Sequence, residues 1–205
     1  MQTAINTDLI SFNDWTLRVR PSSAGNPRLL VMIHGWTGDE NSMWVFTRGF
    51  PSDYWIVAPR APHAAESKGF SWRPPQTATF GRPSLETLLP AAEGLIHLID
   101  EYSASVKVEA RQFDLIGFSQ GGAMVNVVGL LYPDRVRKMG VLAGFLPAGL
   151  DDVIAKKPLA GKNVFVAHGT QDEMVPVDRA RASMEELERA GAQVIYGVKG
   201  FKAHA

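Results

Sequence analysis

The sequence contains no cysteine, carries no net charge and has no long apolar run. Without cysteine the chain cannot form a disulfide, a thiolate metal site or a cysteine nucleophile. Its 21 basic and 21 acidic residues balance, so no excess of positive charge predicts a nucleic acid or an anionic membrane as partner. No segment approaches the roughly 20 apolar residues that span a bilayer, and the first residues lack the basic and apolar stretches of a secretory signal. We therefore expect a cytoplasmic protein without stable membrane insertion.

What remains is an ordinary globular composition. The 205 residues, 45% of them apolar and 20% charged, suit a single domain over residues 1–205. Strand-like runs, most of them apolar throughout, alternate with segments of helical periodicity, which predicts an α/β fold with a mostly parallel central sheet and helices on both faces. Expected strands cover a hairpin over 9–20 and the ranges 29–33, 54–59, 113–116, 139–143, 164–167 and 193–196. Expected helices cover 41–50, a segment that begins at Ser84 or only near Leu88 because of Pro90, 123–131, and a segment capped by Asp178 that ends before Gly191.

The most informative stretch is Gly-Phe-Ser-Gln-Gly-Gly at residues 117–122, between an apolar strand and a helix. A Gly-x-Ser-x-Gly turn from strand to helix is the nucleophile elbow of α/β-hydrolases. Gly117 and Gly121 allow strand and helix to approach closely, and the turn pushes the side chain of Ser119 above the sheet. The amide of Gln120 begins the helix and is predicted to bind an oxyanion.

A second glycine-rich loop, His34 to Gly38, follows the apolar strand 29–33. Such a loop at the carboxyl end of a parallel strand turns backbone amides toward the crevice above the sheet, and in α/β-hydrolases it supplies the second oxyanion donor. The loop predicts the amide of Trp36 in that role. We interpret His34 as a structural residue whose ring holds this loop in position.

Residues 60–83 form an irregular stretch rich in proline and aromatic residues, which predicts a functional loop in a compact domain. We expect it to form one wall of a substrate pocket, although core packing under a long loop would explain the same residues. Together with other apolar residues after strand ends, it gives the predicted substrate-binding set: Phe70, Trp72, Phe118, Phe145, Leu146, Met174 and Val175.

A serine needs a base to take its proton and an acid to orient that base. The α/β-hydrolase order is serine, acid, histidine. Ser119, Asp172 and His204 occur in this order, and Asp172 directly follows the strand 164–167. Other acids follow strands less directly: Asp151, Asp152 and Glu173. The five histidines show no His-x-x-x-His pair, so no metal site is predicted.

The motifs at 34–38, 117–122 and 168–176 resemble those of the phospholipase/carboxylesterase family of small serine esterases, relatives of the acyl-protein thioesterases. The resemblance spans roughly residues 28–204. It implies an α/β-hydrolase fold without a large cap domain, and cleavage of carboxylic esters without metal or cofactor. It also implies Ser119 as nucleophile, Asp172 as acid, His204 as base, and the amides of Trp36 and Gln120 as the oxyanion hole.

The end of the sequence departs from this family pattern. Ala203 stands where relatives usually have glycine, and the sequence stops one residue after His204 instead of continuing into a helix. We expect either a shortened carboxyl end or a helix supplied by a partner subunit. His63 and His168 are alternative bases, although His168 lies only four residues before Asp172, a short distance for turning back onto it, and a structural role is preferred.

The predicted function is that of a serine carboxylesterase acting on small to medium apolar esters through an acyl-enzyme intermediate. Two alternatives stay open. The protein could act as a lysophospholipase or acyl-thioesterase, or as a catalytically silent α/β-hydrolase that binds ligands. The expected partner is a small-molecule ester, with nucleic acid excluded and a homodimer possible.

Overall fold

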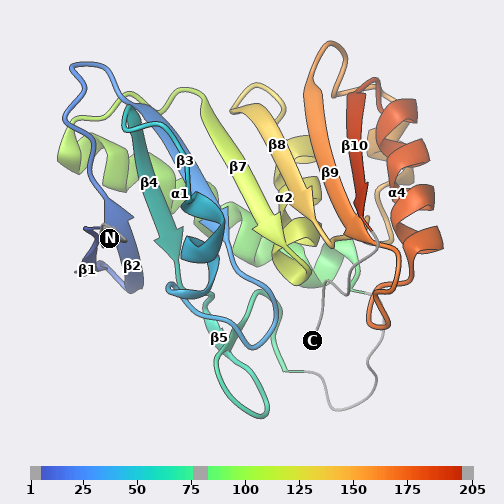
Figure 1. The fold of residues 1–205 in the computed structure, drawn as a ribbon, viewed down its shortest axis with the longest axis horizontal. Helices are drawn as coiled ribbons and strands as arrows, with labels where there is room; N and C mark the ends of the chain where they lie inside the picture. Colours follow the sequence, from blue (N-terminus) through green and yellow to red (C-terminus); the bar gives the residue numbers. More distant parts are fainter. Residues whose placement is uncertain (1–5, 76–82, 200–205) are drawn as a thin grey trace.

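The structure is a computed structural model that describes residues 6–75 and 83–199. Eight strands form one sheet in the order β1-β2-β4-β3-β7-β8-β9-β10 (Figure 1). The sheet strands are β1 (Asp8–Phe12), β2 (Trp15–Arg20), β3 (Arg28–Ile33), β4 (Tyr54–Pro59), β7 (Phe113–Phe118), β8 (Val136–Leu142), β9 (Asn163–Gly169) and β10 (Gln193–Lys199). The helices are the 3₁₀-helix η1 (Ser42–Thr47) and the α-helices α1 (Leu85–Val106), α2 (Gln120–Leu131), α3 (Asp151–Ile154) and α4 (Val177–Arg189). No helix in the described ranges is long and apolar enough to cross a bilayer.

The direction of the strands confirms the predicted α/β architecture. From β4 through β3, β7, β8 and β9 to β10, each strand runs parallel to its neighbour. Among the described strands of this sheet, the antiparallel pairs are β1 with β2 and β2 with β4, and Phe12 pairs with Trp15 across a two-residue turn. Asn13 opens that turn at a φ of 49°, a conformation that asparagine tolerates better than most residues. The predicted hairpin over 9–20 is therefore confirmed.

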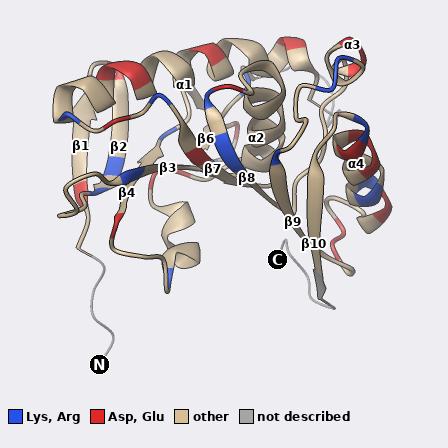
Figure 2. Cartoon of the chain, turned by 90° about the horizontal axis from the view of Figure 1, so that it is seen from above, with Lys and Arg blue, Asp and Glu red and all other residues tan. Residues whose placement is uncertain are grey.

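Figure 2 shows α1, α2 and α4 on one face of the sheet. The 3₁₀-helix η1 packs on the other face, because it contacts the side chains of β3 and β4 that point away from these helices. The first face holds the larger part of the core, where α2 packs against β7 and β8. On the second face a smaller cluster fills the space between η1 and the strands β3 and β4. Its fully or nearly buried members are Leu30, Met32, Met43, Ile56 and Ala58. Apolar strands are thus covered on both sides, as their sequences predict.

Three of the expected helices differ from the structure. The segment expected over 41–50 is only the short 3₁₀-helix η1. Helix α1 begins at Leu85 and contains Pro90, so the delayed start near Leu88 was wrong. Pro90 is exposed, which keeps its ring away from the core. Helix α4 is capped by Pro176 rather than by Asp178, which lies in the first turn, whereas Gly191 ends the helix at a φ of 91° as expected.

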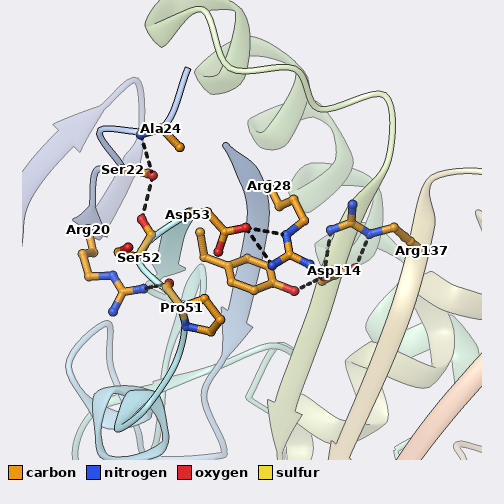
Figure 3. Close-up of polar contacts among 10 residues, drawn as sticks. Arg20, Ser22, Ala24, Arg28, Pro51, Ser52, Asp53, Asp114 and Arg137 are labelled. Atoms are coloured by element: carbon orange, nitrogen blue, oxygen red, sulfur yellow. Dashed lines mark hydrogen bonds and ion pairs between the residues drawn. The ribbon is translucent and has the colours of Figure 1, made fainter. Parts of the chain in front are cut away.

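A polar network connects the amino ends of four strands, β3, β4, β7 and β8 (Figure 3). Asp114 of β7 is nearly buried and accepts two hydrogen bonds of 2.8 Å from Arg137 of β8 and one of 2.8 Å from the hydroxyl of Tyr54. Arg28 binds Asp53 and lies over the ring of Tyr54, 4.2 Å from its centroid. This network joins β3, β4, β7 and β8 at the edge of the sheet opposite to the carboxyl ends of the strands.

Candidate active site

The turn between β7 and α2 has the geometry that its glycine pattern predicts. Ser119 lies between the two elements at φ 54° and ψ −115°, a strained conformation for a residue with a side chain. A Cβ at Gly117 would lie 2.2 Å from the carbonyl oxygen of Gly121, and one at Gly121 would lie 2.1 Å from that of Ile33. Both glycines are therefore required by close backbone contacts. The predicted strand–turn–helix with a strained central serine is confirmed.

The carboxyl ends of the neighbouring strands are held together at this turn. The amide of Ser119 donates a 2.9 Å hydrogen bond to the carbonyl of Leu142 at the end of β8, and the amide of Ala143 donates one of 2.8 Å to Ala167 of β9. On the other side, a Cβ at Gly35 would lie 3.3 Å from the Cβ of Ser119, so the loop after β3 runs directly beside the serine. The carboxyl ends of the parallel strands β3, β7, β8 and β9 thus lie at one edge of the sheet.

The imidazole of His34 holds the loop after β3 in place. The ring is buried, its Nε2 accepts a 3.0 Å hydrogen bond from the amide of Ala61, and its Nδ1 donates one of 2.7 Å to the carbonyl of Gly35. These partners fix the neutral tautomer, and burial lowers the pKa of the ring. The structural role expected for His34 is confirmed. Trp36, two residues on, exposes 36% of its surface beside this loop.

Asp172 lies in the loop between β9 and α4 with its side chain buried. Its Oδ1 accepts hydrogen bonds of 3.0 Å from the amide of Met174 and 2.9 Å from that of Val175, which fix the carboxylate in one orientation. His168 does reach back to Asp172, since its Nε2 lies 3.6 Å from the carboxylate Oδ2, so the expectation that four residues are too few for this contact was wrong. The same Nε2 lies 2.7 Å from the carbonyl of Val175, a contact that supports a structural role.

The other two candidate bases are placed differently. His63 lies in the two-residue strand β5 (His63–Ala64), which pairs with β6 (Phe70–Ser71) in a small second sheet. His204 lies outside the residues that the structure describes. Within the described ranges, no group of three or more histidine or acidic side chains could hold a metal ion.

The predicted apolar pocket residues divide into an accessible and a buried set. Phe70, Phe118 and Met174 keep accessible surface, with 56% of Met174 exposed. The ring of Phe118 stacks on that of Phe46, whose centroid is 6.1 Å away, so η1 contributes an aromatic residue that the sequence reading missed. The buried set belongs to the core: Trp72, Phe145, Leu146 and Val175.

Trp72 is the clearest correction among the predicted pocket residues. Its side chain is fully buried, its indole N–H donates a 2.8 Å hydrogen bond to the carbonyl of His34, and its ring packs against the imidazole with 5.3 Å between centroids. A side chain without accessible surface offers nothing for a substrate to contact. Trp72 therefore supports the loop after β3 through its contacts with His34 and does not line a pocket.

The ion pair between Glu40, in the loop after β3, and Arg60, directly after β4, was not predicted. Glu40 is 2% exposed and accepts hydrogen bonds of 2.8 and 3.0 Å from Arg60, whose guanidinium lies 4.5 Å from the ring centroid of Phe70. Burial raises the pKa of Glu40, but the hydrogen bonds from Arg60, a backbone hydrogen bond and the positive charge of Arg60 together outweigh it, and the net shift is downward. The two residues lie 20 positions apart in ordinary loops, so no local pattern in a single sequence marks them.

The chain is similar to known proteins in sequence and in fold. The family model of the phospholipase/carboxylesterases matches residues 16–199, which include the elbow, the loop after β3 and Asp172. The chain belongs to the phospholipase/carboxylesterase family. Family membership confirms the resemblance seen in the three motifs.

Individual relatives of this family are distant. Carboxylesterase SOBER1 of Arabidopsis thaliana is 29% identical over 113 residues, which cover 54% of this chain and 49% of the relative. The chain spans about half the length of the plant carboxylesterases that it matches. Acyl-protein thioesterase 1 of Mycosarcoma maydis is 27% identical over 197 residues, which cover 84% of this chain and 81% of the relative. Among solved structures, a carboxylesterase from Mesorhizobium loti has the same fold, with a TM-score of 0.83 at 22% identity over 98% of this chain and 92% of that one.

Proposed function

We propose that this protein is a serine hydrolase that cleaves carboxylic esters through an acyl-enzyme intermediate. The observation that carries the proposal is the strained backbone of Ser119 between β7 and α2. A strained residue persists only where its surroundings hold it, and such residues concentrate at active sites. Relatives named carboxylesterase and acyl-protein thioesterase support a hydrolase.

Ser119 is the proposed nucleophile. Its Oγ attacks the ester carbonyl, and the negative charge that develops on the carbonyl oxygen is stabilised by two backbone amides. The amide of Gln120 belongs to the first turn of α2, where N–H groups have no acceptor within the helix. The amide of Trp36 is the proposed second donor, since Gly35 runs beside Ser119.

Asp172 and His204 complete the proposed triad. The carboxylate of Asp172 is held by two backbone amides and is positioned after β9, two strands from β7 in the sheet. His204, the proposed base, takes the proton of Ser119 and returns it to the leaving alcohol, and water then releases the acid. No metal or cofactor enters this reaction.

The proposed substrates are small to medium apolar esters. Accessible apolar side chains at the carboxyl end of the sheet come from the loop after β3, from η1, from the end of β7 and from the loop after β9, and they would contact an acyl or alcohol chain. They are Trp36, Phe46, Phe118 and Met174. The similarity to the fungal acyl-protein thioesterase over 84% of the chain makes a thioester the second candidate substrate.

The experiment is hydrolysis of aryl esters and matched thioesters from two to sixteen carbons by the wild type and three variants. We expect Ser119→Ala and His204→Ala to lower kcat by roughly 10³-fold or more, because each removes a member of the proton-transfer unit. Asp172→Asn is expected to lower it by roughly 10³- to 10⁴-fold, because the amide orients the imidazole wrongly. The ratio of kcat/KM between ester and thioester at each length separates the two candidate substrates.

Two controls decide between an enzyme and a silent binding protein. A fluorophosphonate probe should label the wild type at Ser119 and leave Ser119→Ala unlabelled. Ester hydrolysis that survives in Ser119→Ala would rule out the proposed mechanism. Absence of both labelling and hydrolysis in a folded wild type would favour the ligand-binding alternative.

A further inference from the structure

Residues 70–72 connect the loop after β3 with the first turn of α2, the two elements that carry the proposed oxyanion donors. The carbonyl of Phe70 accepts a 3.0 Å hydrogen bond from the amide of Thr37, and the amide of Phe70 donates one of 2.9 Å to the carbonyl of Gly38. Two residues later, the amide of Trp72 donates a 3.0 Å hydrogen bond to Oε1 of Gln120. One short segment thus contacts the residue after Trp36 and the side chain of the other donor residue.

The side chain of Gln120 does not face solvent. Gln120 is 5% exposed, and besides accepting from Trp72 its Nε2 donates a 3.2 Å hydrogen bond to Oγ of Ser71. Ser71 is in turn fixed by Arg73, because its hydroxyl donates to the carbonyl of Arg73 and accepts from its amide. The carboxamide of Gln120 therefore has both ends engaged, and its position determines how the first turn of α2 sits against residues 71–72.

The other end of the segment is equally fixed. The indole of Trp72 donates to the carbonyl of His34, at the start of the loop that leads to Trp36. A Cβ at Gly69 would lie 2.0 Å from the carbonyl oxygen of Thr37, so the two backbones are in direct contact there. The guanidinium of Arg60, bound to Glu40, lies over the ring of Phe70. Residues 70–72 therefore have little freedom to shift.

We propose that residues 70–72 and the side chain of Gln120 form a brace that sets the separation of the two oxyanion donors, the amides of Trp36 and Gln120. The brace rests on the proposed function, since it concerns the same reaction. Gln120 thereby has two parts: its backbone amide is a catalytic donor, and its carboxamide is a positioning group that touches no substrate. Oxyanion donors act only when they stand within hydrogen-bond distance of the developing charge, so a loosened brace should weaken binding of the transition state more than that of the substrate.

The test compares Gln120→Met with Ser71→Ala in the full chain. Methionine has nearly the shape of glutamine but can neither accept from Trp72 nor donate to residue 71. Misplacement of a catalytic group by about 1 Å costs about 100-fold, so we expect Gln120→Met to lower kcat by roughly 10- to 100-fold with KM changed less than about twofold. Ser71→Ala leaves the bond from Trp72 in place and should give a smaller loss. Affinity for a trifluoromethyl ketone, which forms a tetrahedral adduct at the serine, should fall in parallel with kcat.

Tyr54→Phe is the matched control, because it removes one hydrogen bond to Asp114 at the opposite edge of the sheet. It should lower the midpoint of urea unfolding while kcat stays at the wild-type value. The brace is overturned if Gln120→Met is folded and keeps wild-type kcat. It is also overturned if Tyr54→Phe, destabilised to the same extent, loses as much kcat as Gln120→Met does. Failure of the proposed function is separate, since it would appear as activity in Ser119→Ala or as no activity in the wild type.

Discussion

At the scale of single residues, Ser119 combines a side chain with a backbone conformation that suits glycine. Its φ of 54° with ψ of −115° is the mirror image of an extended conformation, and the turn imposes it because Gly117 and Gly121 bring strand and helix together. A residue with a Cβ held in such a conformation is strained by about 1–3 kcal/mol. The fold therefore gives up stability at the point where it presents the serine hydroxyl.

That strain predicts different free energies of unfolding for two substitutions at the same position. Ser119→Gly relieves the strain but adds freedom to the unfolded chain, so we expect it to unfold with a free energy about 1 kcal/mol higher than Ser119→Ala. Both variants should lack esterase activity. Urea unfolding followed by tryptophan fluorescence measures the difference. A glycine variant less stable than the alanine variant would contradict the strain.

At the scale of elements, α1 tolerates a proline six residues into the helix. Pro90 cannot donate to the carbonyl of Glu86, and its ring crowds that carbonyl, which costs up to about 3 kcal/mol in a helix interior. The side chain is exposed, so its removal leaves no cavity. We expect Pro90→Ala to raise the free energy of unfolding by roughly 1–3 kcal/mol, measured by urea denaturation. Pro51→Ala, an exposed proline in the loop before β4, is the control and should give no gain.

The elements that the sequence predicted well are those that depend on residues close together along the chain. Apolar strands, the turn at Asn13 and the glycine after α4 follow from side-chain periodicity and from local backbone preference. The errors arose where distant contacts decide the structure. The segment around Trp44 forms a 3₁₀-helix because it covers β3 and β4 over only a few residues, and α1 starts before Pro90 because Leu88 is fully buried against the core.

At the scale of the whole molecule, the candidate site also has features that local sequence predicts and features that only distant contacts determine. The order of the strands brings the loops after β3, β7 and β9 to one edge, which the alternation of strands and helices was sufficient to predict. The supporting contacts were not predictable, because Glu40 with Arg60 and Gln120 with Trp72 join segments 20 and 48 residues apart. Trp72 shows the consequence: its type suggested a pocket, and its partners place it in the core.

The buried neutral ring of His34 makes the stability of the whole molecule depend on pH. Burial lowers its pKa in the folded state against the opposing effects of Gly35, Asp39 and Glu40, whereas in the unfolded chain a histidine titrates near about 6.5. Below that pH the unfolded chain binds a proton that the folded ring does not, so protonation favours unfolding. We expect the free energy of unfolding to be constant with respect to this group above about pH 7 and to fall as the pH drops through about 6.5.

Urea unfolding at pH 7.5, 6.5 and 5.5 measures this loss, and it can be assigned to one residue. His34→Gln removes the titrating ring while keeping a side-chain oxygen that can accept from the amide of Ala61. The variant should be less stable than the wild type at pH 7.5, because glutamine does not reproduce both hydrogen bonds, but its stability should change less between pH 7.5 and 5.5. Equal slopes in the two proteins would mean that other groups carry the pH dependence. A smaller slope in the variant would show that the imidazole that positions the loop beside Ser119 also sets the acid limit of the fold.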